Sequence, residues 1–595
     1  MLPEPFEDSR RLTGCNFYFS GTGAALEAAR GVPFDDAAID RWRGHLAAAR
    51  RVLAWPEGDV VVRRHRSGVS LAFAAPLDQL YTATEVNEWA WWSALSSEPA
   101  NHHGDRYHAP GHPAVGDADS AIRTLQALAR AEAAPALLAL QSQATAHGLP
   151  FLADDDFVSI GAGDGGSTWP AAALPAPASI RWPRLHAIPT ALVTGSNGKT
   201  TTVRLLAAMA HAHGWRTAYS STDGVSFDGM ALESGDFSGP AGARTALRQS
   251  TAQAAVLETA RGGLLRRGLA ICSANVAVVT NVAADHFGEY GIHDLDDLAA
   301  VKLTVARAIG DDGLLVLNAD DAVLLRQSRA LACPIGWFAL DFDAEVLKKH
   351  RQEGGATCGV RDGRLLLHRL DAVTDLGAVA DMPLTMSARA TYNAANIAAA
   401  ALAADALGIA SHAVAQVLSR FGRRHDDNPG RLQHWRFGDV DVYVDYAHNP
   451  DGLQNLLRTV GADERSARMA IILGHAGNRE DDDLRAVAIT AAAFHPELVV
   501  LKDIGGYERG RGAGEIAAIM RDALRVAGVP AGNIETRLDE IEAARRPLEW
   551  ARSGDLLVLP VHELDARKAV VEWLDALQAQ GWRAGMPLPP IGAGE

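Results

Sequence analysis

The sequence predicts an α/β protein in which two domains with parallel sheets follow an α+β domain. Two observations predict it. Short, continuously apolar runs alternate with helical patterns over the last two thirds of the chain, and a stretch rich in glycine, proline and alanine separates them from the first 160 residues. Strands of a parallel sheet are continuously apolar because helices cover both of its faces.

Composition shifts divide the chain into four parts. We expect an N-terminal α+β domain over residues 1–160, a linker over 161–184, a central domain over 185–428 and a C-terminal domain over 429–595. Glycines followed by alternating proline and alanine favour an extended linker that is poor in regular structure. In the N-terminal domain, residues 59–64 and 68–74 have the pattern of strands, and residues 118–147 have helical spacing.

Strands and helices alternate through the two later domains. A helix is predicted over residues 199–213, and Gly214 is expected to end it. The apolar runs predict strands over residues 188–194, 254–258, 276–281 and 314–318, and then over 440–446, 469–474, 497–503 and 555–560.

Composition and charge exclude several classes of protein. The chain has 595 residues, of which 48% are hydrophobic and 22% charged, as in ordinary globular proteins. Its 56 basic and 72 acidic residues give a net charge of −16, which argues against nucleic acid or membrane as a partner. The four cysteines form no CxxC pair, so we expect neither a disulfide framework nor a cysteine-rich zinc site. The N-terminus lacks a signal-peptide pattern, and we expect a cytoplasmic protein.

Residues 194–202, TGSNGKTTT, join a predicted strand to a predicted helix. Small residues let the backbone surround an anion, Lys199 reaches the terminal phosphates, and the Thr200 hydroxyl can bind Mg²⁺. Val193 stands where the general phosphate-loop pattern has a glycine. The alternative, an ordinary strand-to-helix turn, is weakened by the position between a buried strand and a helix, which predicts a P-loop-type central domain.

Four further side chains are candidates for the same edge of the sheet. Glu258 ends a predicted strand, and the carboxyl ends of parallel strands form the ligand edge of such a sheet. Asp285 and His286 follow another strand, and Lys302 lies on an apolar helix. Taken singly, each has a plain alternative: a solvent-facing glutamate, a helix-capping aspartate beside a surface histidine, and a surface lysine.

In this order and spacing, these features resemble the ATP-dependent Mur ligase family. The resemblance continues through YNAANIAA at 392–399, NPGR at 428–431 and DYAHNP at 445–450. STDG at 221–224, LETARGGLLRRGL at 257–269, and Lys502 with RGRGAGE at 509–515 are most similar to the cyanophycin synthetase branch of that family. The resemblance implies a Rossmann-like C-terminal domain.

The resemblance also implies roles for individual residues. Lys199 and Thr200 would hold the phosphates and one Mg²⁺, with Glu258, His286 and Lys302 serving the metals and Lys302 as the position that is carbamylated in several members. The implied metal ligands are thus Thr200, Glu258, His286 and Lys302. The implied catalytic residues are Lys199, Glu258, His286 and Lys302. The nucleotide would be bound by Gly195, Asn197, Gly198, Lys199, Thr200, Thr201, Asn281, Asn393, Asn396, Arg431, Asp445 and His448.

The function that this resemblance implies is ATP-dependent formation of an amide through an acyl phosphate. The substrates would be a carboxylate of a peptide or small acid and an amino acid, with ATP and Mg²⁺ as cofactors. The chain has no ATP-grasp domain between its N-terminal and later parts, unlike full cyanophycin synthetase. It would therefore perform one of two ligations, alone or with a separately encoded ATP-grasp ligase, or it would form a different product. The oligomeric state stays open.

Two rival functions come from other classes. A non-catalytic, regulatory nucleotide-binding subunit would keep the fold, but the complete set of candidate residues argues against it. A metal-dependent amidase in the N-terminal domain is suggested by a histidine-rich loop with two nearby glutamates, although such a loop is more often polar surface. Its candidate ligands are Glu85, Glu88, His102, His103, Asp105, His108 and His112.

Four consecutive acids, Glu480 to Asp483, follow a predicted strand of the C-terminal domain. They predict a preference for arginine, or lysine as second choice, because a carboxylate cluster can pair with a cationic side chain. The alternative is that acids at a helix start are stabilised by the helix dipole and bind no ligand.

Overall fold

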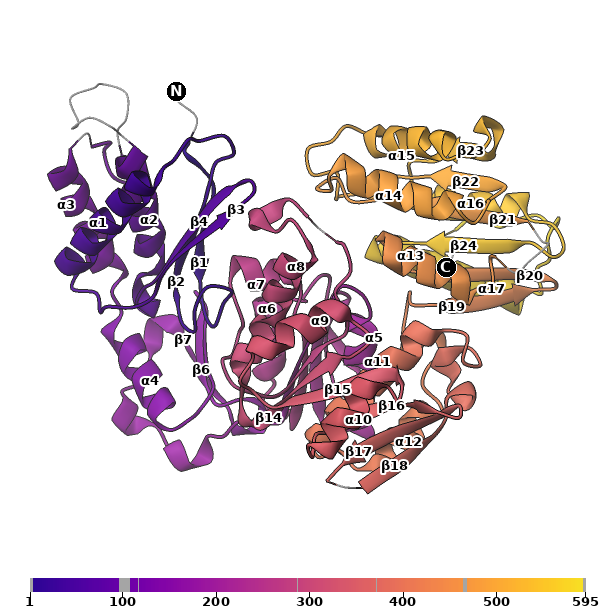
Figure 1. Cartoon of the computed structure of the whole chain (residues 1–595), viewed down its shortest axis with the longest axis horizontal. Coiled ribbons are helices and arrows are strands. Elements are labelled where there is room, and N and C mark those ends of the chain that lie inside the picture. The colour runs from indigo at the N-terminus through magenta and orange to yellow at the C-terminus, as the bar shows by residue number, and fades with distance from the viewer. Residues whose placement is uncertain are drawn as a thin grey trace.

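The computed structural model describes residues 4–95, 107–115, 117–285, 287–370, 372–463 and 468–591 (Figure 1). It confirms the predicted fold class: a small antiparallel domain precedes two α/β domains with mainly parallel sheets. In Figure 1 the C-terminal domain lies opposite the N-terminal domain, and the central domain lies below and between them. No helix in the described ranges is long and apolar enough to cross a membrane.

The N-terminal domain contains an antiparallel sheet of four strands in the order β1-β2-β4-β3. Its strands are β1 (Phe6–Leu12), β2 (Gly23–Ala28), β3 (Val60–His65) and β4 (Gly68–Ala74). Apolar side chains of α1 (Asp36–Leu53), α2 (Leu80–Leu95) and α3 (Ala118–Glu132) form a core with this sheet. The helical pattern over 118–147 forms two helices, α3 and α4 (Pro135–Ala146), because Pro135 starts a new helix at its first turn.

The stretch expected as a linker contains regular structure. A three-stranded antiparallel sheet is formed by β5 (Phe151–Ala153), β6 (Phe157–Ile160) and β7 (Ser167–Pro170). Trp169, Ile180 and Trp182 pack against Leu140 of α4, so these apolar residues fix the path of the proline-rich chain.

The central domain has an eleven-stranded sheet in the order β11-β10-β9-β12-β8-β13-β14-β15-β16-β17-β18. The strands from β9 to β16 in this order pair in parallel, and antiparallel hairpins complete both edges. The strands are β8 (Thr190–Thr194), β9 (Thr217–Ser221), β10 (Gly224–Phe227), β11 (Met230–Ser234), β12 (Ala254–Glu258), β13 (Ala274–Val279), β14 (Ile309–Asn318), β15 (Ile335–Asp341), β16 (Thr357–Arg361), β17 (Arg364–Arg369) and β18 (Ala372–Ala378).

Helices bury both faces of the central sheet. One face packs against α5 (Lys199–Ala212), α11 (Thr391–Ala406) and α12 (Ser411–Leu418). The other face packs against α6 (Pro240–Leu247), α7 (Arg261–Arg266), α8 (Leu295–Lys302), α9 (Ala322–Gln327) and α10 (Glu345–Gln352). The continuously apolar strands therefore have the environment that their sequences predict.

The C-terminal domain has a six-stranded sheet in the order β19-β20-β24-β21-β22-β23, parallel except for β19. Its strands are β19 (Gln433–Phe437), β20 (Val440–Asp445), β21 (Met469–Leu473), β22 (Leu498–Leu501), β23 (Ile534–Thr536) and β24 (Leu556–Pro560). One face is covered by α13 (Pro450–Thr459), α14 (Asp481–Ala492) and α15 (Glu515–Val526), and the other by α16 (Glu540–Trp550) and α17 (Leu564–Ala579).

A disulfide joins Cys15 of the N-terminal domain to Cys272 of the central domain, with a Cα–Cα distance of 5.6 Å. We did not expect a disulfide from cysteine spacing. The two residues are 257 positions apart in the sequence and meet only because the two domains pack together, so local spacing carries no signal for the pair.

A buried charge pair lies where the N-terminal and central domains meet. The Arg10 guanidinium donates to Glu27 Oε1 at 2.7 Å and to the Leu265 carbonyl of α7 at 2.8 Å. Burial alone would raise the pKa of Glu27, but the nearby His65 ring, the charge of Arg10 and a hydrogen bond from Ser70 lower it to about 2.

Arg10→Met should reduce the free energy of unfolding by about 3–5 kcal/mol, because it leaves the buried Glu27 carboxylate without its guanidinium. Urea denaturation followed by tryptophan fluorescence measures this. Arg43→Met, which removes an exposed pair with Asp40, is the matched control and should cost less than about 1 kcal/mol. Equal stability of the Arg10→Met and wild-type proteins would show that the Arg10–Glu27 pair does not stabilise the fold.

Candidate functional site

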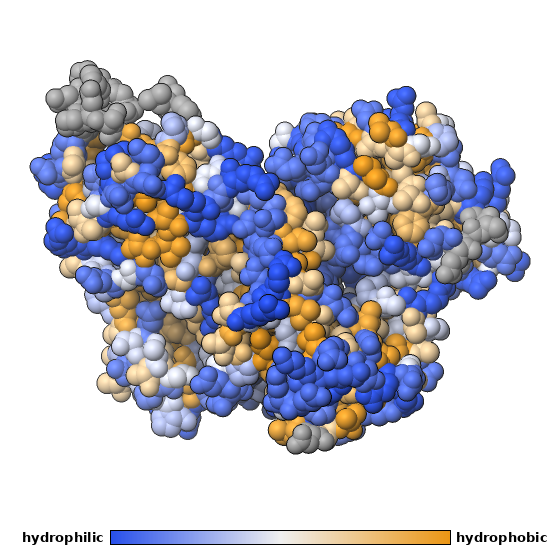
Figure 2. All heavy atoms as spheres, viewed as in Figure 1, coloured by the Kyte–Doolittle hydropathy of each residue, from blue (hydrophilic) through white to orange (hydrophobic). Residues whose placement is uncertain are grey.

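A cavity of about 700 Å³ lies between the carboxyl ends of the central strands and the C-terminal domain. Figure 2 shows the surface cleft between the C-terminal lobe and the rest of the molecule. The central domain contributes the loop before α5, the end of β12, the start of α7 and Lys302. The C-terminal domain contributes Arg431, the loop after β20, and residues that follow β21 and β24.

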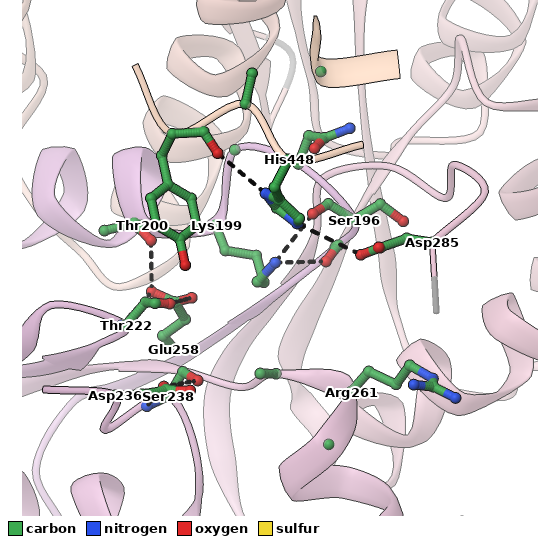
Figure 3. Close-up of a pocket in the computed structure, with 18 of the residues that line it drawn as sticks. Ser196, Lys199, Thr200, Thr222, Asp236, Ser238, Glu258, Arg261, Asp285 and His448 are labelled. Atoms are coloured by element: carbon green, nitrogen blue, oxygen red, sulfur yellow. Dashed lines mark hydrogen bonds and ion pairs between the residues drawn. The ribbon is translucent and has the colours of Figure 1, made fainter. Parts of the chain in front are cut away.

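The loop between β8 and α5 has the close contacts of a phosphate loop. At Gly198, φ is +84° and an added Cβ would lie 2.2 Å from Asn396 Oδ1. At Gly195 an added Cβ would lie 1.8 Å from the Thr280 hydroxyl. Neither position can take a side chain without a shift of its neighbours. Lys199 begins α5, and its ammonium donates to the carbonyls of Gly195 and Ser196, both at 3.1 Å (Figure 3).

Asn281 holds this loop through both of its amide atoms. Its Oδ1 accepts from the Asn197 backbone N–H at 2.9 Å, and its Nδ2 donates to the Asn197 carbonyl at 3.2 Å. The Thr280 hydroxyl donates to the same carbonyl at 2.6 Å. Asn281 therefore lines the cavity and also fixes the backbone of the phosphate loop.

Glu258 is buried at the end of β12, beside the phosphate loop. Its carboxylate accepts from the Thr200 hydroxyl at 2.9 Å and from the Thr222 hydroxyl at 2.7 Å (Figure 3). The contact follows from topology, because β12 pairs with both β8 and β9, whose following residues carry the two threonines. Thr222 was not predicted, although it lies within the STDG segment that the resemblance singled out.

These side chains fit a magnesium ion. A carboxylate and two hydroxyls are hard oxygen donors, which Mg²⁺ prefers, and Mg²⁺ ordinarily completes its shell with phosphate oxygens and water. Within the described ranges no cluster of three or more histidine, cysteine, aspartate or glutamate side chains could hold a metal by itself. His286, also predicted for the metals, lies outside the described residues.

Lys302 is the last residue of α8 and points into the cavity wall rather than into solvent, with 2% of its surface exposed. Burial lowers its pKa well below the ordinary value, and the charges of Lys199 and Arg261 add to this effect, while Asp285 opposes it. A neutral amine is therefore favoured at this position.

The predicted nucleotide residues of α11 are buried beside the phosphate loop. Asn396 touches Gly198, and its Nδ2 donates to Asn393 Oδ1 at 3.2 Å. Asn393 in turn donates to the Leu384 carbonyl at 3.0 Å. The Thr201 hydroxyl accepts from Asn428 Nδ2 at 3.2 Å, at the connection to the C-terminal domain.

Arg431 and Asp445 lie on the C-terminal side of the cavity. The Arg431 guanidinium stands 4.2 Å from the centre of the Tyr446 ring. Asp445 accepts from the backbone N–H groups of Leu432 and Ala447, at 2.6 and 2.8 Å. Burial raises the pKa of Asp445, although Arg431 and these hydrogen bonds oppose the shift.

The loop after β20 reaches across to the central domain. Asn449 donates to Asn197 Oδ1 at 2.9 Å, and Asn197 Nδ2 donates to Asp451 at 2.8 Å. His448 lies beside Lys199, with its Nε2 3.7 Å from Asp285 Oδ2 (Figure 3). The structure thus brings the described candidate residues of both domains to one cavity.

Three cavity arginines, which sequence reasoning missed, make no ion pair with a carboxylate of the described chain. Arg266 donates to the Tyr290 hydroxyl at 3.1 Å, and Arg267 donates to backbone carbonyls. Arg509 stands 5.5 Å from the Tyr507 ring centre. We call these three residues the arginine rim. Their only sequence signal was the pair of basic segments at 257–269 and 509–515.

The four acids at 480–483 do not line the cavity, so they do not support a preference for a cationic amino acid. Glu480 immediately precedes α14, without a capping hydrogen bond from its side chain, and the three aspartates form the first turn. Asp481 pairs with Arg485 and Arg511, and Asp482 pairs with Arg485. Acids at a helix start are favoured by the helix dipole, which explains the run without a ligand.

The N-terminal histidine-rich loop gives no metal site in the described chain. His102, His103 and Asp105 lie outside the described residues. Glu85 accepts from the Tyr107 hydroxyl at 3.0 Å, and burial raises the pKa of Glu88 to about 7.

Comparisons with known proteins agree with this geometry. The Mur ligase middle domain matches residues 193–404, and the Mur ligase, glutamate ligase domain matches residues 430–560. A cyanophycin synthetase of Trichormus variabilis is 36% identical over 375 residues, which cover 62% of this chain and 41% of the relative. The chain thus spans less than half the length of that relative.

A UDP-N-acetylmuramoyl-L-alanyl-D-glutamate–2,6-diaminopimelate ligase of Xanthomonas campestris is 30% identical over 379 residues, covering 62% of this chain and 70% of the relative. A solved folylpolyglutamate synthase of Mycobacterium tuberculosis is 18% identical, with a TM-score of 0.47, and the match covers 65% of this chain and 91% of that one. Two consecutive domain matches and the diaminopimelate ligase likeness place the chain in the Mur ligase family of ATP-dependent ligases.

Proposed function

We propose that the chain joins a carboxylate to the amine of an amino acid, using ATP bound between the central and C-terminal domains. The observation that carries this proposal is the contact of Glu258 with Thr200 and Thr222 beside Lys199, within a cavity large enough for a nucleotide and a substrate. The roles of the individual residues below are part of the proposal.

The difficulty in such a reaction is that a carboxylate resists attack by an amine. A carboxylate oxygen first attacks the γ-phosphorus of ATP, which releases ADP and forms an acyl phosphate. The neutral amine then attacks the acyl carbon, the bond to the phosphate oxygen breaks, and an amide and phosphate result. Mg²⁺, held by Thr200 and Glu258, would neutralise negative charge on the phosphate oxygens.

Lys199 supplies charge to the transferred phosphoryl group. In the structure its ammonium donates to two carbonyls of its own loop, so it needs only a side-chain rotation to reach a phosphate. The backbone N–H groups at the start of α5 add positive potential at the same place. Charge placed in advance where negative charge gathers is a major source of rate enhancement.

The C-terminal domain closes the site against water, which would hydrolyse an acyl phosphate. Arg431 and Asp445 line the cavity and would contact the nucleotide from this side, and the bonds of Asn449 and Asp451 to Asn197 keep the domain against the phosphate loop.

The arginine rim is the proposed binding place for an anionic carboxylate substrate. Arg266 and Arg267 come from the central domain and Arg509 from the C-terminal domain, so they approach the cavity from opposite sides. Guanidinium groups without a protein carboxylate partner are available to substrate carboxylates. The match covers 41% of the cyanophycin synthetase of Trichormus variabilis, and a separately encoded ATP-grasp ligase remains a proposed partner.

Lys199→Ala should lower the rate of Mg²⁺-dependent phosphate release about a hundredfold or more, because it removes the charge on the terminal phosphates. Phosphate release with ATP, carboxylate and amino acid measures this. Lys568→Ala, at an exposed lysine of α17, is the control and should behave as wild type. A folded Lys199→Ala protein that retains substantial activity refutes the role of Lys199.

Lys302 is expected to carry a carbamate, because its amine is buried at the cavity and burial lowers its pKa, which favours the neutral form that reacts with CO₂. After exposure to ¹³CO₂, the wild-type protein should give a carbamate carbon signal by NMR that Lys302→Met lacks, and activity should increase with added bicarbonate. Lys568→Met is the control and should keep the signal. A wild-type protein without the signal, together with a fully active Lys302→Met variant, rules the carbamate out.

Arg509→Met should raise the KM for an anionic acceptor about tenfold, since a charged hydrogen bond contributes about 1.5–3 kcal/mol. The acceptor comes from a phosphate-release screen of aspartate-rich peptides and small acids, each with arginine, lysine, alanine or glutamate as amine. The KM for ATP should stay unchanged, and Arg525→Met, on an exposed face of α15, is the control. An unchanged KM for the acceptor excludes Arg509 from its binding.

A further inference from the structure

Four buried or nearly buried polar side chains form a row across the carboxyl edge of the C-terminal sheet. They follow strands or begin a helix at that edge, and we call them the edge clamp: Lys502 after β22, His475 after β21, His562 after β24 and Glu540 at the start of α16. None has an assigned part in the reaction above.

The clamp begins at a buried ion pair. Lys502 is completely buried, and its ammonium contacts the Glu540 carboxylate. Glu540 also accepts from the backbone N–H groups of His562 and Glu563, at 2.7 and 2.9 Å. Burial alone would raise the pKa of Glu540, but the Lys502 ammonium lowers it far below the usual range. Glu540 is therefore ionised and its contacts are satisfied.

Gly474 makes room for this pair. An added Cβ at position 474 would lie 2.7 Å from Lys502 Cγ and 2.5 Å from the Lys502 carbonyl oxygen. The absence of a side chain after β21 thus lets Lys502 reach over that strand toward His562, which follows β24.

Lys502 sets the protonation of His562. Its ammonium donates to His562 Nδ1 at 3.0 Å, so the ring carries its proton on Nε2, which donates to the Ala447 carbonyl at 3.1 Å. Burial and the Lys502 charge lower the pKa of His562 to about 4. The imidazole is neutral near pH 7 and acts as a donor of fixed direction.

His475 makes the same kind of contact with the next carbonyl. The Ala476 N–H donates to its Nδ1 at 2.8 Å, and its Nε2 donates to the His448 carbonyl at 2.6 Å. Burial lowers the pKa of His475 well below its ordinary value. Two neutral imidazoles therefore hold two consecutive carbonyls of the loop after β20.

This loop connects the C-terminal domain to the phosphate loop. It carries His448, which lines the same cavity as Lys199, and Asn449, which donates to Asn197 Oδ1 at 2.9 Å. Displacement of the loop would shift both side chains and loosen the contact between the domains. A hydrogen-bonded support behind a functional residue commonly changes affinity or activity about 10- to 100-fold when removed.

We propose that the edge clamp positions the loop at residues 446–449 over the phosphate loop, so that the two domains bind the nucleotide together. The inference rests on the proposed function, because it assigns the clamp to nucleotide binding at that site. These side chains are positioning residues and touch no reacting atom.

The test compares His562→Leu with His562→Gln. Leucine removes the donor to Ala447 and leaves the Lys502–Glu540 pair intact, whereas the glutamine amide can replace the Nε2 donor. Lys502→Met is less suitable, because an unpaired buried Glu540 would prevent folding. His475→Leu and His475→Gln repeat the comparison at the second carbonyl, and His412→Leu, at an exposed histidine of α12, is the control.

Binding of a fluorescent ATP analogue and steady-state kinetics are the measurements. His562→Leu should weaken analogue binding and raise the KM for ATP about tenfold or more, and His562→Gln should recover most of the loss. A merely structural role would reduce the fraction of active protein, and with it kcat, without a change in KM.

Equal nucleotide affinity of His562→Leu and wild type would overturn the proposal that the edge clamp supports nucleotide binding. Equal impairment of the leucine and glutamine variants would overturn it as well, since only glutamine keeps a donor. Failure of the wild-type protein itself to bind nucleotide would instead overturn the proposed function, so the two failures are distinguishable.

Discussion

Two hydrogen bonds to the side chain of Asn197 connect the phosphate loop to the C-terminal domain. They help to hold the two domains together around the cavity that both of them line. Asn449 donates to the side-chain oxygen of Asn197, and the side-chain nitrogen of Asn197 donates to Asp451. An added Cβ at Gly452 would lie 3.2 Å from Asn197 Oδ1, so a side chain at this position of α13 would crowd Asn197. Through this contact the carboxyl ends of two separate parallel sheets face one cavity, and neither domain supplies the site alone.

The N-terminal domain supports the opposite wall of that cavity. Thr13 donates its backbone N–H to the Arg267 carbonyl at 2.8 Å, and Arg10 donates to the Leu265 carbonyl. Arg63 contacts Asp297 at the start of α8 and the Gly291 carbonyl in the preceding loop. The segments that carry Arg266, Arg267 and Lys302 are thus held by side chains and backbone far away in the sequence. The described part of the N-terminal domain thus supports the site through these contacts, although none of its residues lines the cavity.

Sequence patterns predicted the parts of the structure that depend on residues close together in the sequence. Continuously apolar runs gave the parallel strands, and Ala254–Glu258 has the predicted bounds. The position of Glu258 at the carboxyl end of its strand made it a candidate for the ligand edge, but the family resemblance was needed to prefer that placement over a solvent-facing glutamate. Lys302 required the family resemblance, since helical spacing alone leaves open whether a lysine faces solvent or a cavity.

Features that depend on pairing between distant segments were not predicted. Cys15 and Cys272 meet only through domain packing, and Thr222 becomes a partner of Glu258 only because β9 and β12 are neighbours. The run of acids at 480–483 predicted a cationic ligand because its charge is evident from the sequence. Its actual partners are Arg485, in the next helix turn, and Arg511, in a loop about thirty residues later. Lys502 and His562 are likewise brought together by strand order rather than by sequence.

The central claim is that the carboxylate is activated as an acyl phosphate in this cavity, and oxygen transfer tests it most directly. An acceptor whose carboxylate is labelled with ¹⁸O is incubated with ATP, Mg²⁺ and amino acid, and the released phosphate is analysed by mass spectrometry. Attack of the carboxylate on the γ-phosphorus, followed by loss of phosphate to the amine, leaves one labelled oxygen in that phosphate. Amide formation with unlabelled phosphate would contradict the mechanism.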